Sequence, residues 1–593
     1  MKRRGNVLGL GALVLLIFIS ACRKETPSSQ QPSVEDLAAR VTALADEYVR
    51  EARLRFPELA SFLGWPDAPL DRLSDNSLEA LHEWQDKEDR WSAELSRIDA
   101  SSLWGHPEWL TFGYLREIVE SSRAARIARS ELWPVNHMSG WQAGFAQLAA
   151  IQPVGTPEKR SQALSRWRMV PRYIDNEISN LREGLRLGYT APKLTVRLTI
   201  GQLDALLKAP FESSPFWSPA TRDNTPEFVD AWRKLMADEI YPAIRRYRDF
   251  LDKEYLGGAR DSIGVSALPN GREIYKALFR QSTTLNRSAE ETFRLGQEAV
   301  QRYEAEAAAI GQEVTGSSDL AVIRNRIKSD PANFFKDREE LLAFSRAAVE
   351  RARQAMPQWF LTIPKANVVV EPVPGFLEKT ASSGYEPAAA DGSRPGTYRI
   401  NLYQPEKQMR STMEVTAFHE TYPGHHFQIS VAMEMPAGHR IAQIPMSGGY
   451  IEGWARYSEA LAEEMGIYES PYARISRRLW PAHGMVVDPG IHVMGWTREQ
   501  AVDFVFATGR FSEHEAESLI DRVIATPAQL TSYDTGALEF FALRKKAEEI
   551  LGAKFDIRAF HDELLKYGSV TLPMLREIIE RWISRTAKGS AGQ

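Results

Sequence analysis

The chain has 593 residues, of which 43% are hydrophobic and 25% are charged, a balance typical of a folded protein rather than a disordered or fibrous one. A net charge of −5 over this length gives no strong field for attracting nucleic acid, so we expect no nucleic-acid partner. The single cysteine excludes a disulfide framework and a zinc site made of four cysteines.

The N-terminus predicts export and lipid attachment. A basic segment at residues 2–4 is followed by an apolar stretch at 7–19, which is shorter than the roughly 20 residues of a membrane span and fits a signal sequence. The stretch leads to Ile19-Ser20-Ala21-Cys22, which resembles a bacterial lipobox, where the cysteine carries lipid after cleavage. A plain secretory signal with an incidental cysteine is the alternative. Small residues before Cys22 and a polar segment after it favour the lipobox.

These signals divide the chain into three parts. Residues 1–21 are the expected signal peptide and 22–33 a polar tether, and 34–593 form a single large domain because no long flexible linker interrupts them. Arg23 follows the cysteine, at the position where an aspartate would favour the inner membrane of a Gram-negative cell. We therefore expect a protein anchored by lipid in the outer membrane and facing the periplasm.

Helical periodicity dominates the mature chain. Apolar spacing and helix-end signals predict helices over 33–48, 164–185 (closed by Gly188), 288–310, 543–551 and 557–565. Strand signals are confined to 366–373 and 396–403, which are separated by a loop rich in glycine, proline and serine at 375–395. No fixed-period repeat is present, so a solenoid is not expected. The predicted fold is mainly α with a small β-sheet.

The motifs of several common enzyme classes are missing from the sequence. There is no phosphate-binding loop and no dinucleotide fingerprint after a strand. The nearest candidate for a serine-hydrolase elbow, Pro445-Met446-Ser447-Gly448-Gly449, lacks the first glycine. A cysteine nucleophile would have to be Cys22, which the lipobox uses.

Three of the eleven histidines fall within the eight residues from His419 to His426. In the motif His-Glu-x-x-His, two histidines one helical turn apart bind zinc and the glutamate activates water. Here Glu420 follows His419, but Pro423 stands where the second histidine belongs. Proline interrupts a helix, so a wide turn that inserts two residues would bring His425 to the second ligand position, with His426 supporting a ligand. The spacing leaves the choice between His425 and His426 open, and a simple turn without metal is the alternative.

A third ligand is expected from a helix that follows the flexible segment 447–449. Glu452 and Glu459 are seven residues apart and therefore share one helix face. One carboxylate could bind a metal while the other accepts a hydrogen bond from a ligand histidine. Two glutamates on a solvated face are the alternative. Glu452 lies beside Ile451 and close to Trp454, however, which is an unusual setting for a surface charge.

These motifs resemble those of the bacterial family called domain of unknown function 885, many members of which are described as lipoproteins. The matching stretches are Gly188-Tyr189-Thr190-Ala191-Pro192, His419-Glu420-x-x-Pro423-Gly424-His425-His426, Glu452-Gly453-Trp454-Ala455, Val487-Asp488-x-Gly490-x-His492-x-x-Gly495-Trp496 and Phe555-Asp556-x-Arg558-x-Phe560-His561-Asp562. They span most of the mature chain. The family is grouped with the gluzincin metallopeptidases, so the resemblance implies an α-rich gluzincin-like fold, a small sheet beside the active-site cleft and a zinc hydrolase site.

The chain is more distantly similar to thimet oligopeptidase, in which a second glutamate follows the metal-binding one after seven residues, as Glu459 follows Glu452. Dipeptidyl peptidase III has one extra residue between its histidines, so the two extra residues here extend a trend. The same comparison places Tyr533 near the tyrosine that holds the tetrahedral intermediate. His492 is either a hydrogen-bond donor in the active site or a residue at the start of a helix.

The sequence therefore supports one main hypothesis and one competitor. The main hypothesis is a Zn²⁺-dependent peptidase in which the ion is bound by His419, His425 and Glu452 and the substrate is a peptide. Glu420 is the general base and Tyr533 donates to the oxyanion, with an extended substrate along an edge of the sheet. The competitor is a non-catalytic envelope lipoprotein that binds a ligand or a protein partner and keeps a vestigial metal site. The sequence does not indicate an oligomeric state.

Overall fold

The computed structural model describes residues 33–373, 378, 383–388, 395–434, 438–444 and 446–589. Residues 1–32, which hold the expected signal peptide, Cys22 and nearly all of the tether, lie outside these ranges. The fold is mainly α with one small sheet, as the sequence predicts. Along the described part of the chain, no helix combines the length and the apolarity that crossing a bilayer requires.

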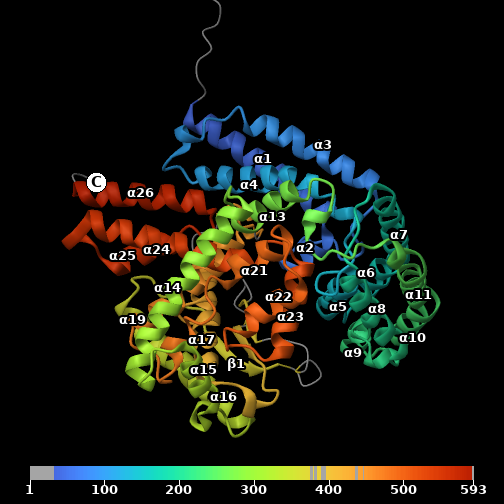
Figure 1. The fold of residues 1–593 in the computed structure, drawn as a ribbon. Helices are drawn as coiled ribbons and strands as arrows, with labels where there is room; N and C mark the ends of the chain where they lie inside the picture. Colours follow the sequence, from blue (N-terminus) through green and yellow to red (C-terminus); the bar gives the residue numbers. More distant parts are fainter. Residues whose placement is uncertain are drawn as a thin grey trace, which may run out of the picture.

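The first helices form a layer along one side of the molecule (Figure 1). They are α1 (Val34–Arg55), α3 (Leu78–Leu95) and α4 (Glu108–Ala125), while the short α2 (Pro57–Phe62) lies below them in this view. α1 begins where the sequence predicts, because the Ser33 side chain accepts a hydrogen bond from the Asp36 backbone and the Asp36 side chain accepts one from the Ser33 backbone. Tyr48, Trp84 and Trp91 pack between these helices with ring centroids 5.1 to 5.7 Å apart.

A second group of helices, drawn in teal and green in Figure 1, has a hydrophobic core of its own. Its members are α5 (Trp141–Ile151), α6 (Pro157–Trp167), α7 (Val170–Leu187), α8 (Lys193–Lys208), α9 (Ser218–Arg222), α10 (Pro226–Leu235), α11 (Tyr241–Phe250) and α12 (Leu256–Gly258). Trp167 and Trp232 are buried in this core with ring centroids 5.5 Å apart.

The single helix predicted over 164–185 is wrong, because the chain breaks between α6 and α7. Pro171 lies in the first turn of α7, where its missing N–H is tolerated. In a continuous helix it would leave the carbonyl of Trp167 without its hydrogen bond. The predicted end is confirmed, since Gly188 closes α7 with a φ of 80°.

Four helices connect these groups to the sheet: α13 (Gly271–Thr283), α14 (Ala289–Thr315), α15 (Leu320–Ser329) and α16 (Arg338–Ala355). α14 begins after Ser288 as predicted, because the Ser288 side chain accepts a hydrogen bond from the Glu291 backbone. It runs past the predicted end to Thr315, where Gly316 takes a φ of 75° and closes it.

The sheet has the strand order β1-β3-β2. β1 (Val368–Pro372) is parallel to β3 (Gly396–Ile400), and β2 (Gly384–Glu386) is antiparallel to β3, with Tyr385 opposite Tyr398. The first and last strands lie within the predicted ranges. β2 lies in the span predicted as a loop, because a three-residue strand among turn-forming residues acquires its structure by pairing with β3.

The C-terminal half of the molecule holds the remaining helices: α17 (Arg410–Glu420), α18 (His425–Glu434), α19 (Gly448–Glu464), α20 (Ala473–Ser476), α21 (His483–His492), α22 (Arg498–Phe506), α23 (Glu513–Ala525), α24 (Ser532–Leu551), α25 (Ile557–Leu565) and α26 (Leu572–Lys588). The predicted bounds of α25 and the predicted C-terminal end of α24 are confirmed, but α24 begins at Ser532 rather than at residue 543. α19 is buried among the other helices, with Tyr450, Trp454 and Tyr457 fully inaccessible. It is therefore the central helix of this half.

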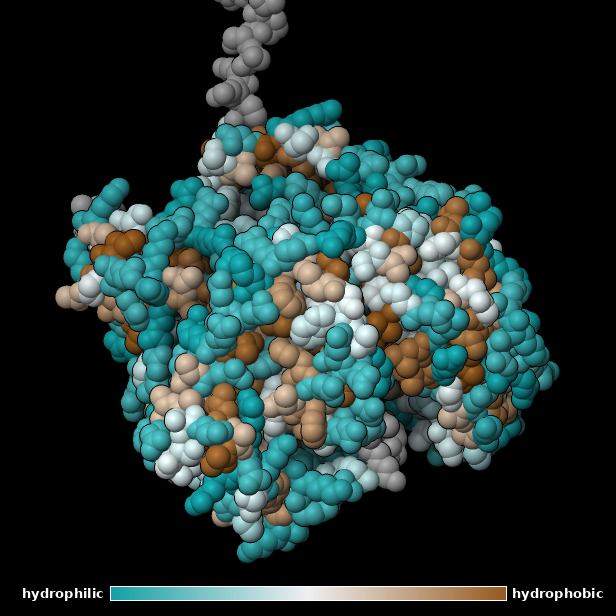
Figure 2. Space-filling model, viewed as in Figure 1, coloured by the Kyte–Doolittle hydropathy of each residue, from teal (hydrophilic) through white to brown (hydrophobic). Residues whose placement is uncertain are grey.

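The surface seen in Figure 2 is mostly hydrophilic, with hydrophobic side chains in small separate groups. Large exposed hydrophobic residues such as Leu54, Phe62 and Ile550 belong to different helices. Scattered exposure of this kind is ordinary and marks no single docking face on this side of the molecule.

α19 and α24 cross with almost no side chains between their backbones. A Cβ atom on Gly536 of α24 would lie 1.8 Å from the carbonyl oxygen of Gly449 on α19. A Cβ atom on Gly453 would lie 2.6 Å from the backbone of Gly536. Glycine is therefore required at these positions, and the crossing fixes how the first turns of α24 lie against α19.

We expect Gly536→Ala to destabilise the fold, because the added methyl group must displace the Gly449 carbonyl. Overpacking of this kind costs about 1–3 kcal/mol. Gly201→Ala is the matched control, since Gly201 lies in α8 and an added Cβ meets nothing within 4 Å. Thermal denaturation should give a lower Tm for the first variant and an equal or higher Tm for the second, in which alanine favours the helix. Equal Tm values would contradict the close crossing.

Candidate metal centre

A wide turn joins α17 to α18 at the predicted place. The Gly424 N–H donates to the Phe418 carbonyl at 3.1 Å and the Phe427 N–H to the Thr421 carbonyl at 3.2 Å, each spanning six residues instead of the four of an α-helix. A Cβ atom on Gly424 would lie 1.9 Å from the His419 carbonyl oxygen, so only glycine fits. The two extra residues predicted from Pro423 are thus present, and His425 begins the second helix.

The turn and α19 bring His419, His425 and Glu452 together. One possible ligand atom from each side chain lies within 4.8 Å of the others. The Nε2 atoms of His419 and His425 lie 3.6 Å and 3.4 Å from Glu452 Oε2. The three side chains are only 12%, 11% and 20% exposed, so the group is shielded from bulk water and still reachable.

The donor set fits a zinc ion. Two histidine nitrogens and one glutamate oxygen are a known set of protein ligands for catalytic zinc. A tetrahedral ion with bonds of about 2.0–2.2 Å separates its ligand atoms by about 3.3–3.6 Å, which is the spacing of Glu452 Oε2 from both rings. Glu452 Oε2 is also buried with no hydrogen-bond partner in the described structure. A bound cation would satisfy this orphaned oxygen.

Glu459 holds the His419 ring in place. His419 Nδ1 donates to Glu459 Oε1 at 2.9 Å, which leaves Nε2 directed at Glu452. Arg456, also buried, donates from Nη1 to both oxygens of Glu459 at 2.9 and 3.0 Å, and its Nε lies 3.6 Å from Asp534 on α24. Burial opposes the charge of Glu459, but Arg456 and His419 lower its pKa to about 2.

The carboxylates of Glu452 and Glu459 also determine the charge of the His419 ring. Burial would lower the pKa of His419, but the nearby carboxylate of Glu452 and the hydrogen bond to Glu459 raise it to about 10. Burial would likewise raise the pKa of Glu452, but the two rings hold it well below its usual range. Without a metal, the pair is therefore a protonated ring beside an ionised carboxylate.

Glu420 lies beside the group at the end of α17. Its carboxyl interacts electrostatically with His419, His425 and Glu452 and accepts a hydrogen bond from the backbone of Tyr385 on β2. Burial raises the pKa of Glu420, while the two rings oppose the rise. The sequence did not indicate Tyr385, because β2 was not predicted.

Tyr533, in the first turn of α24, lies beside the His419 side of the candidate metal group. Its ring stacks on that of His419 with centroids 6.3 Å apart and planes 20° from parallel. Burial, with the charge of Glu452, raises the pKa of Tyr533 to about 12, so the hydroxyl keeps its proton at neutral pH. Arg522 donates to this hydroxyl at 3.4 Å.

His426 points away from the three clustered side chains. Its ring contacts the hydroxyls of Tyr385 and Tyr422 at 2.9 and 3.1 Å and the Ala366 carbonyl at 3.2 Å. Burial lowers the pKa of His426 to about 4, so the ring is neutral. The contacts connect α18 to the strand segments rather than supporting His419 or His425.

His492 is not at a helix start, since it is the last residue of α21. It is completely buried, its Nε2 donates to the Val523 carbonyl at 2.9 Å, and its Nδ1 accepts from the Val265 N–H at 3.4 Å. Burial lowers the pKa of His492 to about 4. Both ring nitrogens are thus occupied by backbone groups, which corrects the expectation of a free hydrogen-bond donor.

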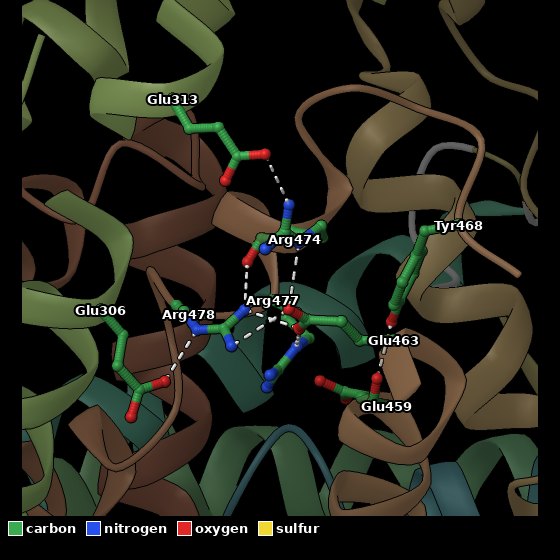
Figure 3. A network of polar contacts seen from close by, with 8 residues as sticks. All are labelled: Glu306, Glu313, Glu459, Glu463, Tyr468, Arg474, Arg477 and Arg478. Carbon is green, nitrogen blue, oxygen red and sulfur yellow. Dashed lines mark hydrogen bonds and ion pairs between the residues drawn. The ribbon is translucent and has the colours of Figure 1, made fainter. Parts of the chain in front are cut away.

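The C-terminal end of α19 is held by a second polar network, which Figure 3 shows. Glu463 pairs with Arg474, Arg477 and Arg478, and the Tyr468 hydroxyl donates to the Glu459 carbonyl at 3.0 Å. A cavity of about 810 Å³ lies here, lined by these residues and by parts of α14 and α24. It belongs to the end of α19 remote from Glu452 and contains none of the clustered side chains.

The fold and the site define a class of protein: a mainly α body whose central helices gather two histidines and a glutamate as a possible metal-binding group. The chain belongs to the family described as "Bacterial protein of unknown function (DUF885)", whose model matches residues 57–579. The family resemblance of the motifs is thereby confirmed. No curated protein matches the chain.

Two solved structures share this fold. The crystal structure of a "putative lipoprotein" from Colwellia psychrerythraea has a TM-score of 0.84 and 23% identity, covering 93% of this chain and 100% of that one. A "putative lipoprotein of unknown function" from Shewanella oneidensis has a TM-score of 0.73 and 20% identity, with the same coverage. At these identities the likeness shows the fold alone.

We expect zinc affinity to rise at least about tenfold per pH unit between about pH 6 and 8, because His419 must lose a proton before Nε2 can bind the ion. The sign follows from its raised pKa of about 10, which keeps the ring protonated over this range. Glu459→Gln should flatten the slope and weaken binding by roughly 10–100-fold. His426→Ala is the control, and it should leave the pH dependence of zinc affinity unchanged. Competition with a coloured chelator measures this, and a flat wild-type profile would remove His419 from the site.

Proposed function

We propose that the protein is a zinc-dependent peptidase. The observation that carries this proposal is the cluster of His419, His425 and Glu452, whose candidate ligand atoms lie within 4.8 Å of one another, with Glu420 beside them. Glu459, seven residues after Glu452, supports the finer proposal of a gluzincin-like site similar to that of thimet oligopeptidase. Zinc bound there would lower the pKa of a water to about 7 and polarise a substrate carbonyl.

In this proposal, Glu420 moves the protons of the reaction. Its carboxylate takes a proton from the water as that water attacks the peptide carbonyl, and returns it to the amine as the C–N bond breaks. Burial raises its pKa, which brings a carboxylate closer to the neutral range where such a base works best. The hydrogen bond from the Tyr385 backbone orients this carboxylate.

In this proposal, Tyr533 stabilises the charge that develops on the carbonyl oxygen. Its hydroxyl is protonated at neutral pH, and its ring stacks on that of His419. The N–H of Arg522 polarises it further. Donors fixed in advance in this way lower the barrier because they do not reorganise during the reaction.

The proposed location is the outer membrane, with the folded domain facing the periplasm. The support is the lipobox-like segment ending at Cys22 and the description of two proteins of the same fold as lipoproteins. Acyl chains at Cys22 would hold the domain at the membrane through the tether.

Glu420→Gln should keep zinc and the fold but lower peptidase activity about 10²–10⁴-fold, because an amide cannot accept the proton. Initial rates on a quenched fluorescent peptide library would measure the loss, with zinc content determined in the same sample. Glu434→Gln is a control, since that glutamate ends α18 and binds the backbone of Lys365 and Ala366. Full activity in zinc-loaded Glu420→Gln would exclude Glu420 as the base.

Cys22→Ser should abolish lipidation and leave the signal sequence attached, because the chain has no second cysteine. Metabolic labelling with a fatty-acid analogue tests this, with a Ser29→Ala variant in the tether as the control. Equal labelling of the wild type and Cys22→Ser would reject the lipobox and the membrane assignment that depends on it.

A further inference from the structure

Arg522 on α23 is a partly buried cation that forms no ion pair with a carboxylate of the described residues. Its Nη2 donates to the side-chain oxygen of Gln529 at 2.7 Å and to the hydroxyl of Tyr533 at 3.4 Å, and both partners are uncharged. Among the residues that the structure describes, no carboxylate lies within 4.0 Å of its nitrogens. A guanidinium has a planar fork of five N–H donors that fits a carboxylate with two parallel hydrogen bonds.

The nearest acid in the sequence is paired elsewhere. Asp521 accepts hydrogen bonds from Arg498 on α22 at 2.7 and 3.1 Å. Arg456, the other arginine close to Tyr533, is paired with Glu459. The positive charge of Arg522 is therefore left available, although a half-buried cation gains from an anionic partner.

Arg522 is separated from the candidate metal group by one side chain. The hydroxyl that it contacts belongs to Tyr533, whose ring stacks on His419. Arg522 also interacts electrostatically with Glu452. An anion bound to this guanidinium would thus lie next to the reacting centre rather than on a remote surface.

We propose that Arg522 binds the C-terminal carboxylate of the substrate and so makes the protein an exopeptidase that releases one or two residues from a peptide C-terminus. This inference rests on the proposed function, because Tyr533 marks where the cleaved carbonyl lies. An extended residue spans at most about 3.3–3.6 Å. Since Arg522 touches Tyr533, the carboxylate lies one or two residues beyond that carbonyl. An acidic side chain offers the same chemistry, and the substrates below distinguish it.

The first experiment compares three peptides that differ only at the last residue: a free acid, its amide, and an amide ending in aspartate. We expect the wild type to cleave the free acid with a kcat/KM about 10–100-fold above the plain amide, as a charge-assisted pair implies. Arg522→Gln should lower the free-acid value to that of the amide, and Arg522→Lys should restore part of the difference. Lys545→Gln, which removes an exposed charge from α24, should keep the full preference. Equal cleavage of the aspartate amide and the free acid would overturn the C-terminal assignment.

The second experiment measures binding without turnover. Zinc-loaded Glu420→Gln protein is titrated with the free acid and the amide by calorimetry, and we expect the acid to bind at least about tenfold more tightly. Adding Arg522→Gln should remove this difference while Tm stays unchanged. If no peptide is hydrolysed by the wild type but the difference persists, the proposed function fails and the carboxylate site stands. If hydrolysis occurs and neither measurement depends on Arg522, the inference fails and the proposed function stands.

Discussion

The geometry of the candidate metal group depends on one buried carboxylate, that of Glu459. It accepts from the His419 ring on one side and from the Arg456 guanidinium on the other, and so ties α17 to α19. Breaking a buried pair of this kind costs roughly 3–5 kcal/mol, because the remaining charge is left in a medium of low polarity. The same contact occupies Nδ1 of His419 and directs Nε2 towards Glu452. One charge pairing therefore sets the tautomer, the ring orientation and the distance between two helices.

Features that depend on neighbours in the chain could be predicted from the sequence. The wide turn follows from Pro423, which cannot donate a backbone hydrogen bond, and the common face of Glu452 and Glu459 follows from helical periodicity. The end of α7 at Gly188 follows from the positive φ that glycine accepts. Arg456 carries a similar signal, four residues after Glu452, but a cation between two carboxylates on a helix is too common to mark a site.

Features that depend on tertiary packing could not be predicted in this way. The strand β2 has no strong local preference and exists through its pairing with β3, so the contact of Tyr385 with Glu420 was not expected. In the sequence, Arg522 looks like any basic residue of an amphipathic helix. Its contact with Tyr533 depends on how α23 packs against the start of α24. His492 belongs to a motif that the family resemblance singled out. In the structure its buried ring instead forms hydrogen bonds to the backbones of Val523 and Val265. The spacing of residues in a sequence motif does not distinguish a structural histidine from a catalytic one.

The two consecutive histidines that begin α18 face different parts of the molecule. His425 points at the metal group, while the next residue, His426, contacts Tyr385 of β2 and the carbonyl of Ala366 before β1. A single helical turn thus joins the candidate metal group to the sheet that lies beside Glu420. A ligand that binds only the folded form stabilises that form against local unfolding. A metal bound here would therefore also stabilise the packing of the sheet against α18, and its removal would favour local opening of the sheet. Under the proposed function, metal occupancy and the alignment of Glu420 would then be thermodynamically linked, so that removal of the metal would disturb the proposed proton acceptor as well.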